Sequence, residues 1–244
     1  MHRIHWDGPL PVEGTAATVG EDEAAHALRV KRMRIGEAIE LLDGSGGVAR
    51  GKVESVAGSG GGRRGGLVVR VERVRHEGEV RPRVEVWAAT PKGARVDEMV
   101  EGLSEVGAAA WIPLRAERSV VEPRMTKLDR LSRLAVESAK QCGRAWFLRI
   151  EQERTLRDAL TRANGTRVIV ADASGVGADE IERTETAVVR VVVGPEGGWT
   201  AEELASARDA GAVVTRFGPH SMRVETAAVA AAAVVLNRFG SGPD

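Results

Sequence analysis

Two successive strand–loop–helix units near the carboxyl end constrain the fold more than any other feature, because each loop carries a glycine next to a proline. The first unit runs from a valine-rich strand, 187–193, into the loop 194–198. The second runs from the apolar run 212–214 into the loop 218–223, and a helix is expected from about Glu225. Strands that alternate with helices form mostly parallel sheets, so both loops are expected at one edge of the same sheet. That edge, at the carboxyl ends of the strands, is where α/β proteins bind ligands.

Composition allows a sizeable core and excludes several classes of function. The chain has 244 residues, 43% of them hydrophobic, which is enough for one large or two smaller domains. Basic and acidic residues number 35 each, which argues against a uniformly basic nucleic-acid coat but not against a local basic patch. The single cysteine, Cys142, cannot form an internal disulfide and no secretory signal is present, so a cytoplasmic location is expected. No apolar run is long enough for a membrane span and the histidines lack metal-ligand spacing, so neither membrane nor metal is expected.

The amino-terminal region, residues 1–75, is predicted to form a small β-barrel. Short β-type segments at 38–42, 48–53 and 67–71 are separated by glycine-containing turns, a spacing typical of such barrels. Before them lies a basic cluster without any acid, which fits a solvated edge as well as a nucleic-acid contact. The candidate RNA-binding residues of this cluster are Arg29, Lys31, Arg32 and Arg34.

From about residue 76 the pattern changes to alternating strands and helices. Residues 80–83 are interpreted as a linker, and apolar positions at helical spacing between 96 and 106 predict an amphipathic helix that Gly107 ends. Further elements are expected as strands at 84–89, 110–114 and 167–171, a long helix capped by Thr126, and a helix opened by the capping box Thr200–Glu203. The fold class of residues 76–244 is therefore α/β, with a mostly parallel sheet covered on both faces.

The first glycine–proline loop offers backbone groups rather than reactive side chains. It lacks the Gly-Lys-Ser/Thr ending of a P-loop and the spaced glycines of a dinucleotide fingerprint. Gly194, Gly197 and Gly198 let a ligand approach the main chain, and Pro195 stiffens the turn. The loop therefore fits a heterocycle bound by its edges as well as a purely structural turn. A Cβ atom at Gly197 or Gly218 is expected to fill this slot.

The second loop adds a fixed cation beside apolar side chains. Arg223 and Glu225 flank the expected start of a helix, near the positive end of its dipole. An arginine there can hold a carboxylate or stabilise a developing anion. Glu225 can instead pair with Arg223 or cap the helix. Phe217 and Met222 are expected to form an apolar slot in the same neighbourhood.

The two carboxy-terminal motifs, taken in order, resemble those of a known family. Val-Gly-Pro-Glu-Gly-Gly at 193–198 is followed by Gly-Pro-His-Ser-Met-Arg-Val-Glu-Thr-Ala at 218–227. This pair is similar to the SPOUT-class RNA methyltransferases and, more narrowly, to the bacterial family that methylates N3 of a uridine in 16S ribosomal RNA. Weaker matches at 28–34, 117–119 and 141–144 extend the resemblance over nearly the whole chain.

The resemblance implies a fold, partners and site residues. It implies a PUA-like RNA-binding barrel over 1–75 and, over 76–244, a methyltransferase domain whose last helix passes through a deep trefoil knot. It also implies a homodimer, S-adenosylmethionine as cofactor, and 16S rRNA of the 30S subunit as substrate. The cofactor is expected at Val193, Gly194, Pro195, Glu196, Gly197, Phe217, Gly218, Met222, Arg223, Thr226 and Ala227. Arg118, Gln141 and Arg144 are expected to join the basic cluster in binding RNA.

Catalysis of this reaction must overcome the proton on uracil N3, which is poorly nucleophilic at neutral pH. A positive group beside the pyrimidine would spread the developing negative charge. Arg223, or an arginine of a partner subunit such as Arg144, is expected in this role, and Glu225 is the nearest candidate for a general base.

Several positions depart from the family pattern and keep other functions open. Departures lie at Gly102, Lys140, His220, Ser221, Met222 and Val224. One alternative is a knotted methyltransferase acting on another RNA, such as tRNA. The other is a non-catalytic RNA-binding assembly factor that has kept the fold. A nucleotide-dependent oxidoreductase is disfavoured because no spaced glycine fingerprint is present.

Overall fold

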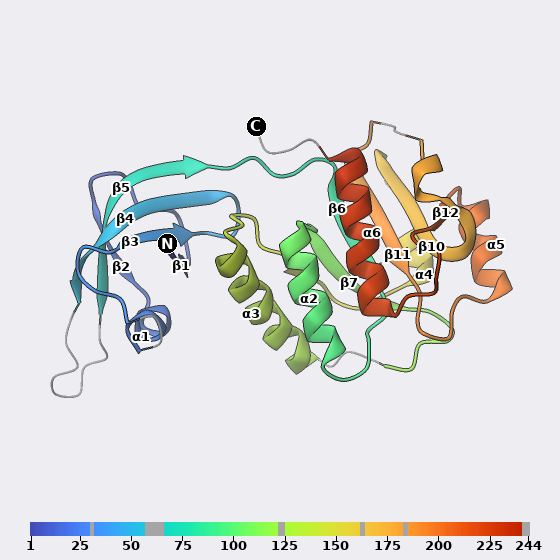
Figure 1. Ribbon diagram of the computed structural model, residues 1–244, viewed down its shortest axis with the longest axis horizontal. Coiled ribbons are helices and arrows are strands. Elements are labelled where there is room, and N and C mark those ends of the chain that lie inside the picture. Colours follow the sequence, from blue (N-terminus) through green and yellow to red (C-terminus); the bar gives the residue numbers. More distant parts are fainter. Residues whose placement is uncertain (30–31, 57–65, 122–124, 162–163, 183–184, 241–244) are drawn as a thin grey trace. The chain divides into compact units, whose positions relative to one another are not determined.

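The chain forms two compact units in the computed structural model, which describes residues 1–29, 32–56, 66–121, 125–161, 164–182 and 185–240. The small unit comprises residues 1–79 together with 139–147. The large unit comprises 80–138 and the chain from 148 onwards. Figure 1 shows the elements of each unit, coloured along the sequence.

The small unit is built on a five-stranded, curled sheet with strand order β1-β3-β4-β5-β2 (Figure 1). Its elements are β1 His2–His5, β2 Ala16–Val19, α1 Glu21–Arg29, β3 Ala38–Leu42, β4 Gly47–Val56 and β5 Leu67–His76. The strands predicted at 38–42, 48–53 and 67–71 are confirmed. Strand β1 pairs parallel with β3 and the other neighbours pair antiparallel. One side of the sheet buries apolar side chains such as Ile39 and Val69.

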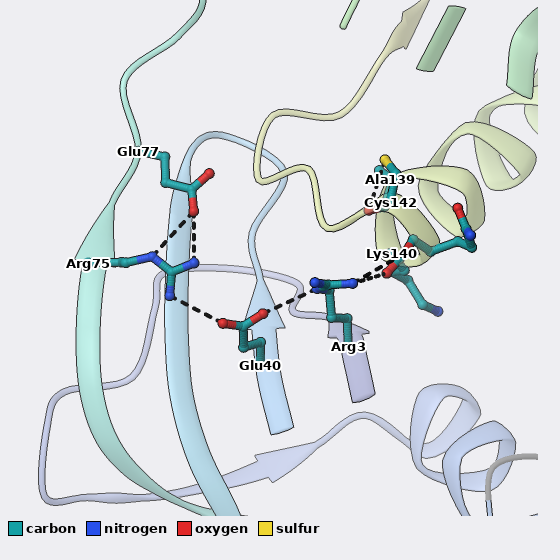
Figure 2. A network of polar contacts seen from close by, with 8 residues as sticks. Arg3, Glu40, Arg75, Glu77, Ala139, Lys140 and Cys142 are labelled. Carbon is teal, nitrogen blue, oxygen red and sulfur yellow. Dashed lines mark hydrogen bonds and ion pairs between the residues drawn. The ribbon is translucent and has the colours of Figure 1, made fainter. Parts of the chain in front are cut away.

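A polar network ties the end of a long helix to this sheet within the small unit (Figure 2). Glu40 is only 5% exposed and accepts hydrogen bonds from Arg3 and Arg75, each at 3.2 Å. Arg3 also donates to the main-chain carbonyls of Lys140 and Gln141 at 3.2 Å. These bonds use carbonyl groups that the end of a helix leaves without intrahelical donors.

The large unit contains a sheet of seven parallel strands. Its main path has the order β12-β10-β11-β6-β7-β8, and β9 also pairs with β7. The strands are β6 Arg83–Ala88, β7 Ala110–Arg115, β8 Arg149–Ile150, β9 Arg154–Thr155, β10 Thr166–Gly177, β11 Val188–Val193 and β12 Val213–Arg216. Every pairing is parallel, which confirms the predicted parallel sheet.

Helices cover both faces of that sheet, as predicted (Figure 1). One face is covered by α2 Arg95–Val106, α3 Met125–Cys142 and α6 Val224–Phe239. The other face is covered by α4 Leu156–Leu160 and α5 Ala201–Asp209. A short 3₁₀ turn, η1 Ala178–Glu180, precedes β11. Helix α2 ends as predicted at Gly107, whose φ of 99° is the left-handed conformation that glycine adopts most easily. Thr126 lies inside α3, so the prediction that it caps this helix is wrong.

Candidate active site

The carboxyl ends of three neighbouring strands surround a cavity of about 220 Å³. Strand β10 lies between β11 and β12 in the sheet, so the loops that leave β11 and β12 flank the same edge. This confirms that the two glycine–proline loops lie together. Eight of the predicted cofactor residues line the cavity: Val193, Gly194, Pro195, Glu196, Phe217, Gly218, Met222 and Ala227. Gly197, Arg223 and Thr226 do not line it.

A buried tryptophan fixes the first loop to the neighbouring strand. Trp199 is 8% exposed, and its indole Nε1 donates a 2.9 Å hydrogen bond to the carbonyl oxygen of Ala171 on β10. The ring lies so close to Gly194 that a Cβ atom there would be 2.8 Å from Trp199 Cε2. Gly194 is therefore required for the packing of Trp199 against the first loop as well as for access to the main chain.

Arg118, which follows β7, holds the same loop from outside. Its Nη1 donates to the carbonyl oxygen of Gly197 at 2.8 Å and to that of Trp199 at 3.4 Å. A Cβ atom on Gly197 would lie 3.1 Å from Arg118 Cβ. That position therefore faces the arginine stem, and the expectation that a side chain at Gly197 would fill the cavity is wrong.

The predicted capping box is confirmed and has a third partner. Thr200 Oγ1 accepts from the Glu203 amide at 3.1 Å, and Glu203 Oε2 accepts from the Thr200 amide at 3.0 Å. The other oxygen, Glu203 Oε1, accepts from the amide of Glu117 at 2.9 Å. One carboxylate thus joins the start of α5 to the turn that carries Arg118.

The second loop, residues 217–223, is held more loosely. Pro219, His220 and Ser221 are exposed, as is Arg223. Within the described part of the chain, none of these side chains has a hydrogen-bond partner, and Arg223 makes no side-chain cap at the start of α6. Its carbonyl oxygen accepts from the Ala227 amide at 2.8 Å, which starts the helix.

Glu225 does not itself line the cavity and lies next to Arg95 at the start of α2. It is 7% exposed, and its Oε1 lies 3.9 Å from Nη1 of Arg95. Its ion-pair partner is therefore Arg95 rather than Arg223. Its Oε2 is buried and has no hydrogen-bond partner among the described residues. A buried carboxylate oxygen without a donor is costly, so this atom can accept a further hydrogen bond.

Sequence reasoning missed the contribution of strand β10 and two neighbouring side chains. A strand was predicted at 167–171, but not its place: Ala171, Asp172 and Ala173 line the cavity because β10 lies between β11 and β12. Thr215, at the end of β12, also lines it, and its buried Oγ1 has no partner among the described residues. Trp199 could have been suspected from its place directly before the capping box.

The residues predicted to bind RNA are distributed over both units. Arg32 and Arg34 are exposed, whereas Met33 between them is buried. Lys31 and the side chain of Arg29 lie outside the described residues. Gln141 and Arg144 belong to the small unit, where Gln141 is exposed and Arg144 is partly buried. Burial lowers the pKa of the Arg144 guanidinium to about 10, against the opposing effects of Cys142 and Glu79, so it stays charged at neutral pH.

Across the described residues, every helix is too short or too polar to cross a membrane. The same residues contain no group of three or more His, Cys, Asp or Glu side chains placed to hold a metal ion.

Comparisons with known proteins identify similar sequences and structures. A family model described as an RNA methyltransferase domain matches residues 79–236, and an RNA methyltransferase PUA domain matches 19–60. The ribosomal RNA small subunit methyltransferase E of Mycobacterium bovis is 38% identical over 93% of this chain and 88% of its own length. The protein of that name from Bacillus subtilis is 27% identical over 88% and 87%.

A solved structure supports the same fold. The ribosomal RNA small subunit methyltransferase E of Neisseria gonorrhoeae, bound to S-adenosyl methionine, superposes with a TM-score of 0.87 over 98% of both chains, at 23% identity. The match at 79–236 contains both loops and all three strands of the cavity. On the strength of that match, this chain belongs to the RNA methyltransferase family.

Proposed function

We propose that this protein transfers the methyl group of S-adenosylmethionine to N3 of a uridine in the 16S rRNA of the small ribosomal subunit. The observation that carries the proposal is the cavity between two glycine–proline loops, which lies within the region matched by the RNA methyltransferase model. Relatives that match almost the full chain are named small-subunit rRNA methyltransferases. The N3 position and the uridine come from the resemblance of the two loop motifs.

The residues present fit S-adenosylmethionine. Main-chain groups of the first loop can read the edge of its adenine, and Phe217, Met222 and Ala227 supply an apolar surface for its ring. The unpartnered hydroxyl of Thr215 offers one more hydrogen bond. When bound, this cofactor supplies an electrophilic methyl group on a sulfonium. We propose that the eight cavity-lining residues hold it, with Gly197, Arg223 and Thr226 beside them.

The protein must also activate the nucleophile, N3 of the uracil. As the N3–carbon bond forms and the carbon–sulfur bond breaks, the N3 proton has to leave. Arg223 is exposed and has no side-chain partner among the described residues, so it is free to meet O2 or O4 of uracil and stabilise the developing anion. Glu225 has a free carboxylate oxygen and is the proposed acceptor of the proton, directly or through water.

We also propose the finer features of the fold. Helix α6 returns from the edge strand β12 to pack against β6, β11 and α2, a path that suits a trefoil knot. The proposed assembly is a homodimer in the cytoplasm, with residues 1–75 as a PUA-like RNA-binding β-barrel and 76–244 as the methyltransferase domain. The proposed RNA contacts are Arg29, Lys31, Arg32, Arg34, Gln141 and Arg144. Arg118 is proposed to hold the first loop, because its guanidinium already donates to two carbonyl groups there.

The test is methyl transfer from labelled S-adenosylmethionine to small subunits that lack the modification. Naked 16S rRNA and assembled 30S particles are compared as substrates, and the product nucleotide is mapped by mass spectrometry. The expected product is N3-methyluridine. A methylated ribose, or methylation of tRNA alone, would support a different member of the class. Tight cofactor binding without transfer to any RNA would support the assembly-factor alternative.

A further inference from the structure

We propose that Arg50 and Arg73 form a phosphate-binding site for the RNA backbone on the outer face of the small unit. The site rests on the proposed function for the identity of its ligand as RNA. It is separate from the basic cluster at 29–34 and lies on strands β4 and β5. Both side chains are exposed.

The strand register places these two arginines directly opposite each other. In the antiparallel β4–β5 pair, Arg50 is the partner of Arg73, one step before a bulge in the register. Residues directly opposite point to the same face of a sheet and lie about 5 Å apart at Cβ. Two like charges in this position repel and destabilise a sheet. The pair is therefore expected to contribute no stability to the isolated sheet.

Among the described residues, no carboxylate pairs with Arg50 or Arg73, although carboxylates on or next to these strands pair with every other arginine and lysine on them. Lys52 pairs with Glu72 at 3.1 Å, Arg70 pairs with Glu54, and Arg75 pairs with Glu77 at 2.8 Å. Among the described residues, Arg50 and Arg73 have no hydrogen-bond or ion-pair partner.

The carboxylate nearest to Arg50 in the register is already occupied. Glu40 on β3 is directly opposite Arg50. Its Oε2 accepts from Arg3 and its Oε1 accepts from Arg75, as Figure 2 shows. Both oxygens of Glu40 are therefore committed to other guanidinium groups. The row across the sheet, from Arg3 through Glu40 to the opposed pair, holds three arginines and one acid.

The chemistry of two adjacent guanidinium groups selects a phosphodiester. Each presents planar N–H donors that match the oxygens of a phosphate. A phosphate between them would convert their repulsion into two charge-assisted hydrogen-bonded pairs. Because base edges are not required, such a site would position RNA without reading its sequence.

The experiment measures binding of the full-length protein to a fluorescent 16S rRNA transcript over a range of salt concentrations. Arg50→Gln with Arg73→Gln is expected to weaken binding by roughly tenfold or more and to reduce the salt slope by about one, for the single phosphate that the pair would hold. Arg73→Glu alone should place opposite charges across the strands without setting a second carboxylate opposite Glu40. It is expected to raise the melting temperature of the protein while it weakens RNA binding.

Two controls separate the site from general effects of charge and folding. Arg157→Gln with Arg208→Gln removes the same charge from exposed positions in the large unit and should leave the salt slope unchanged. Glu54→Gln with Arg70→Gln removes an ion pair from the same two strands without a change in net charge. It should leave RNA affinity within about twofold of the wild type.

The outcomes are distinguishable from failure of the proposed function. An Arg50/Arg73 double variant with wild-type affinity and salt slope overturns the phosphate site, even if the protein methylates 16S rRNA. Absence of wild-type binding to the transcript also overturns it. A wild-type protein that binds through this pair but transfers no methyl group retains the site and refutes the proposed activity. Cofactor affinity, measured by calorimetry, should be unchanged in all of these variants.

Discussion

The two walls of the cavity contain similar residues but are held by very different contacts. The first, 194–199, is fixed by an indole hydrogen bond from Trp199 and by the guanidinium of Arg118. The second, 217–223, has no side-chain hydrogen bond among the described residues, and four of its seven residues are exposed. A glycine next to a proline therefore does not determine how rigid a loop is; the side chains that reach it from other strands do.

This difference suggests that the two loops have different roles in ligand binding. A wall that is already ordered costs little conformational entropy when a ligand binds to it. A wall without internal hydrogen bonds must lose freedom on binding, but it can adapt to the ligand. We expect the first wall to set cofactor affinity. We expect the second, which carries Arg223, to respond to the substrate base and set the rate.

The largest effect is expected from Gly194→Ala, which attacks the rigid wall. Its Cβ atom would lie 2.8 Å from the Trp199 ring, so the ring or the loop must move. Such overpacking typically costs about 1–3 kcal/mol of stability. We expect a lower melting temperature and loss of measurable S-adenosylmethionine binding by calorimetry. Wild-type affinity in this variant would show that the first wall yields as readily as the second.

Arg223→Ala tests the loosely held wall through its only arginine. We expect turnover to fall by about 10²–10³-fold, the usual cost of losing one stabilising donor at a developing anion. Cofactor affinity should change little, because Arg223 does not line the cavity. The measurement is single-turnover methyl transfer at saturating cofactor, with calorimetry alongside. A large loss of cofactor affinity with a normal rate would instead assign Arg223 to binding.

Arg118→Ala should loosen the first wall without blocking the cavity. We expect roughly a tenfold loss of cofactor affinity, because an exposed charged hydrogen bond is worth about 1 kcal/mol after screening by solvent. Arg118→Lys is the matched control, since it keeps the charge but its shorter side chain does not place a donor where Arg118 Nη1 meets both carbonyl oxygens. It should behave more like alanine than like the wild type. Weaker RNA binding with normal cofactor affinity would instead support the sequence-based prediction that Arg118 binds RNA.

Local patterns in the sequence were sufficient to predict most of the sheet and the position of the cavity. A valine-rich run, a capping box and a glycine that ends a helix each involve only a few consecutive residues, so β11, α5 and the end of α2 could be predicted. Helix α1 was missed because a nine-residue helix shows little more than two turns of periodicity.

Contacts between distant segments could not be predicted in the same way. Strand β10 contributes to the cavity because it lies between two strands that follow it in the chain, which is a property of the pairing order. Arg118 donates a hydrogen bond to Gly197, which lies 79 positions away in the sequence, and no local pattern predicts that contact. The opposed pair Arg50 and Arg73 likewise depends on a register that a bulge shifts. Such features follow from tertiary packing rather than from local propensity.

The smallest effect is expected from Gly218→Ala, the counterpart of Gly194→Ala in the second wall. Its Cβ atom would lie 3.7 Å from Met222 Cε, an ordinary van der Waals contact with a flexible side chain, which differs from the sequence-based expectation that a Cβ atom here fills the slot. Replacing glycine where the backbone permits it also restricts the unfolded chain, which stabilises a protein by about 0.4–1 kcal/mol. We therefore expect an unchanged or slightly higher melting temperature, and cofactor affinity within about threefold of the wild type. If Gly218→Ala abolishes binding as completely as Gly194→Ala, then the second wall is as closely fitted to the cofactor as the first, and the contrast between them does not govern binding.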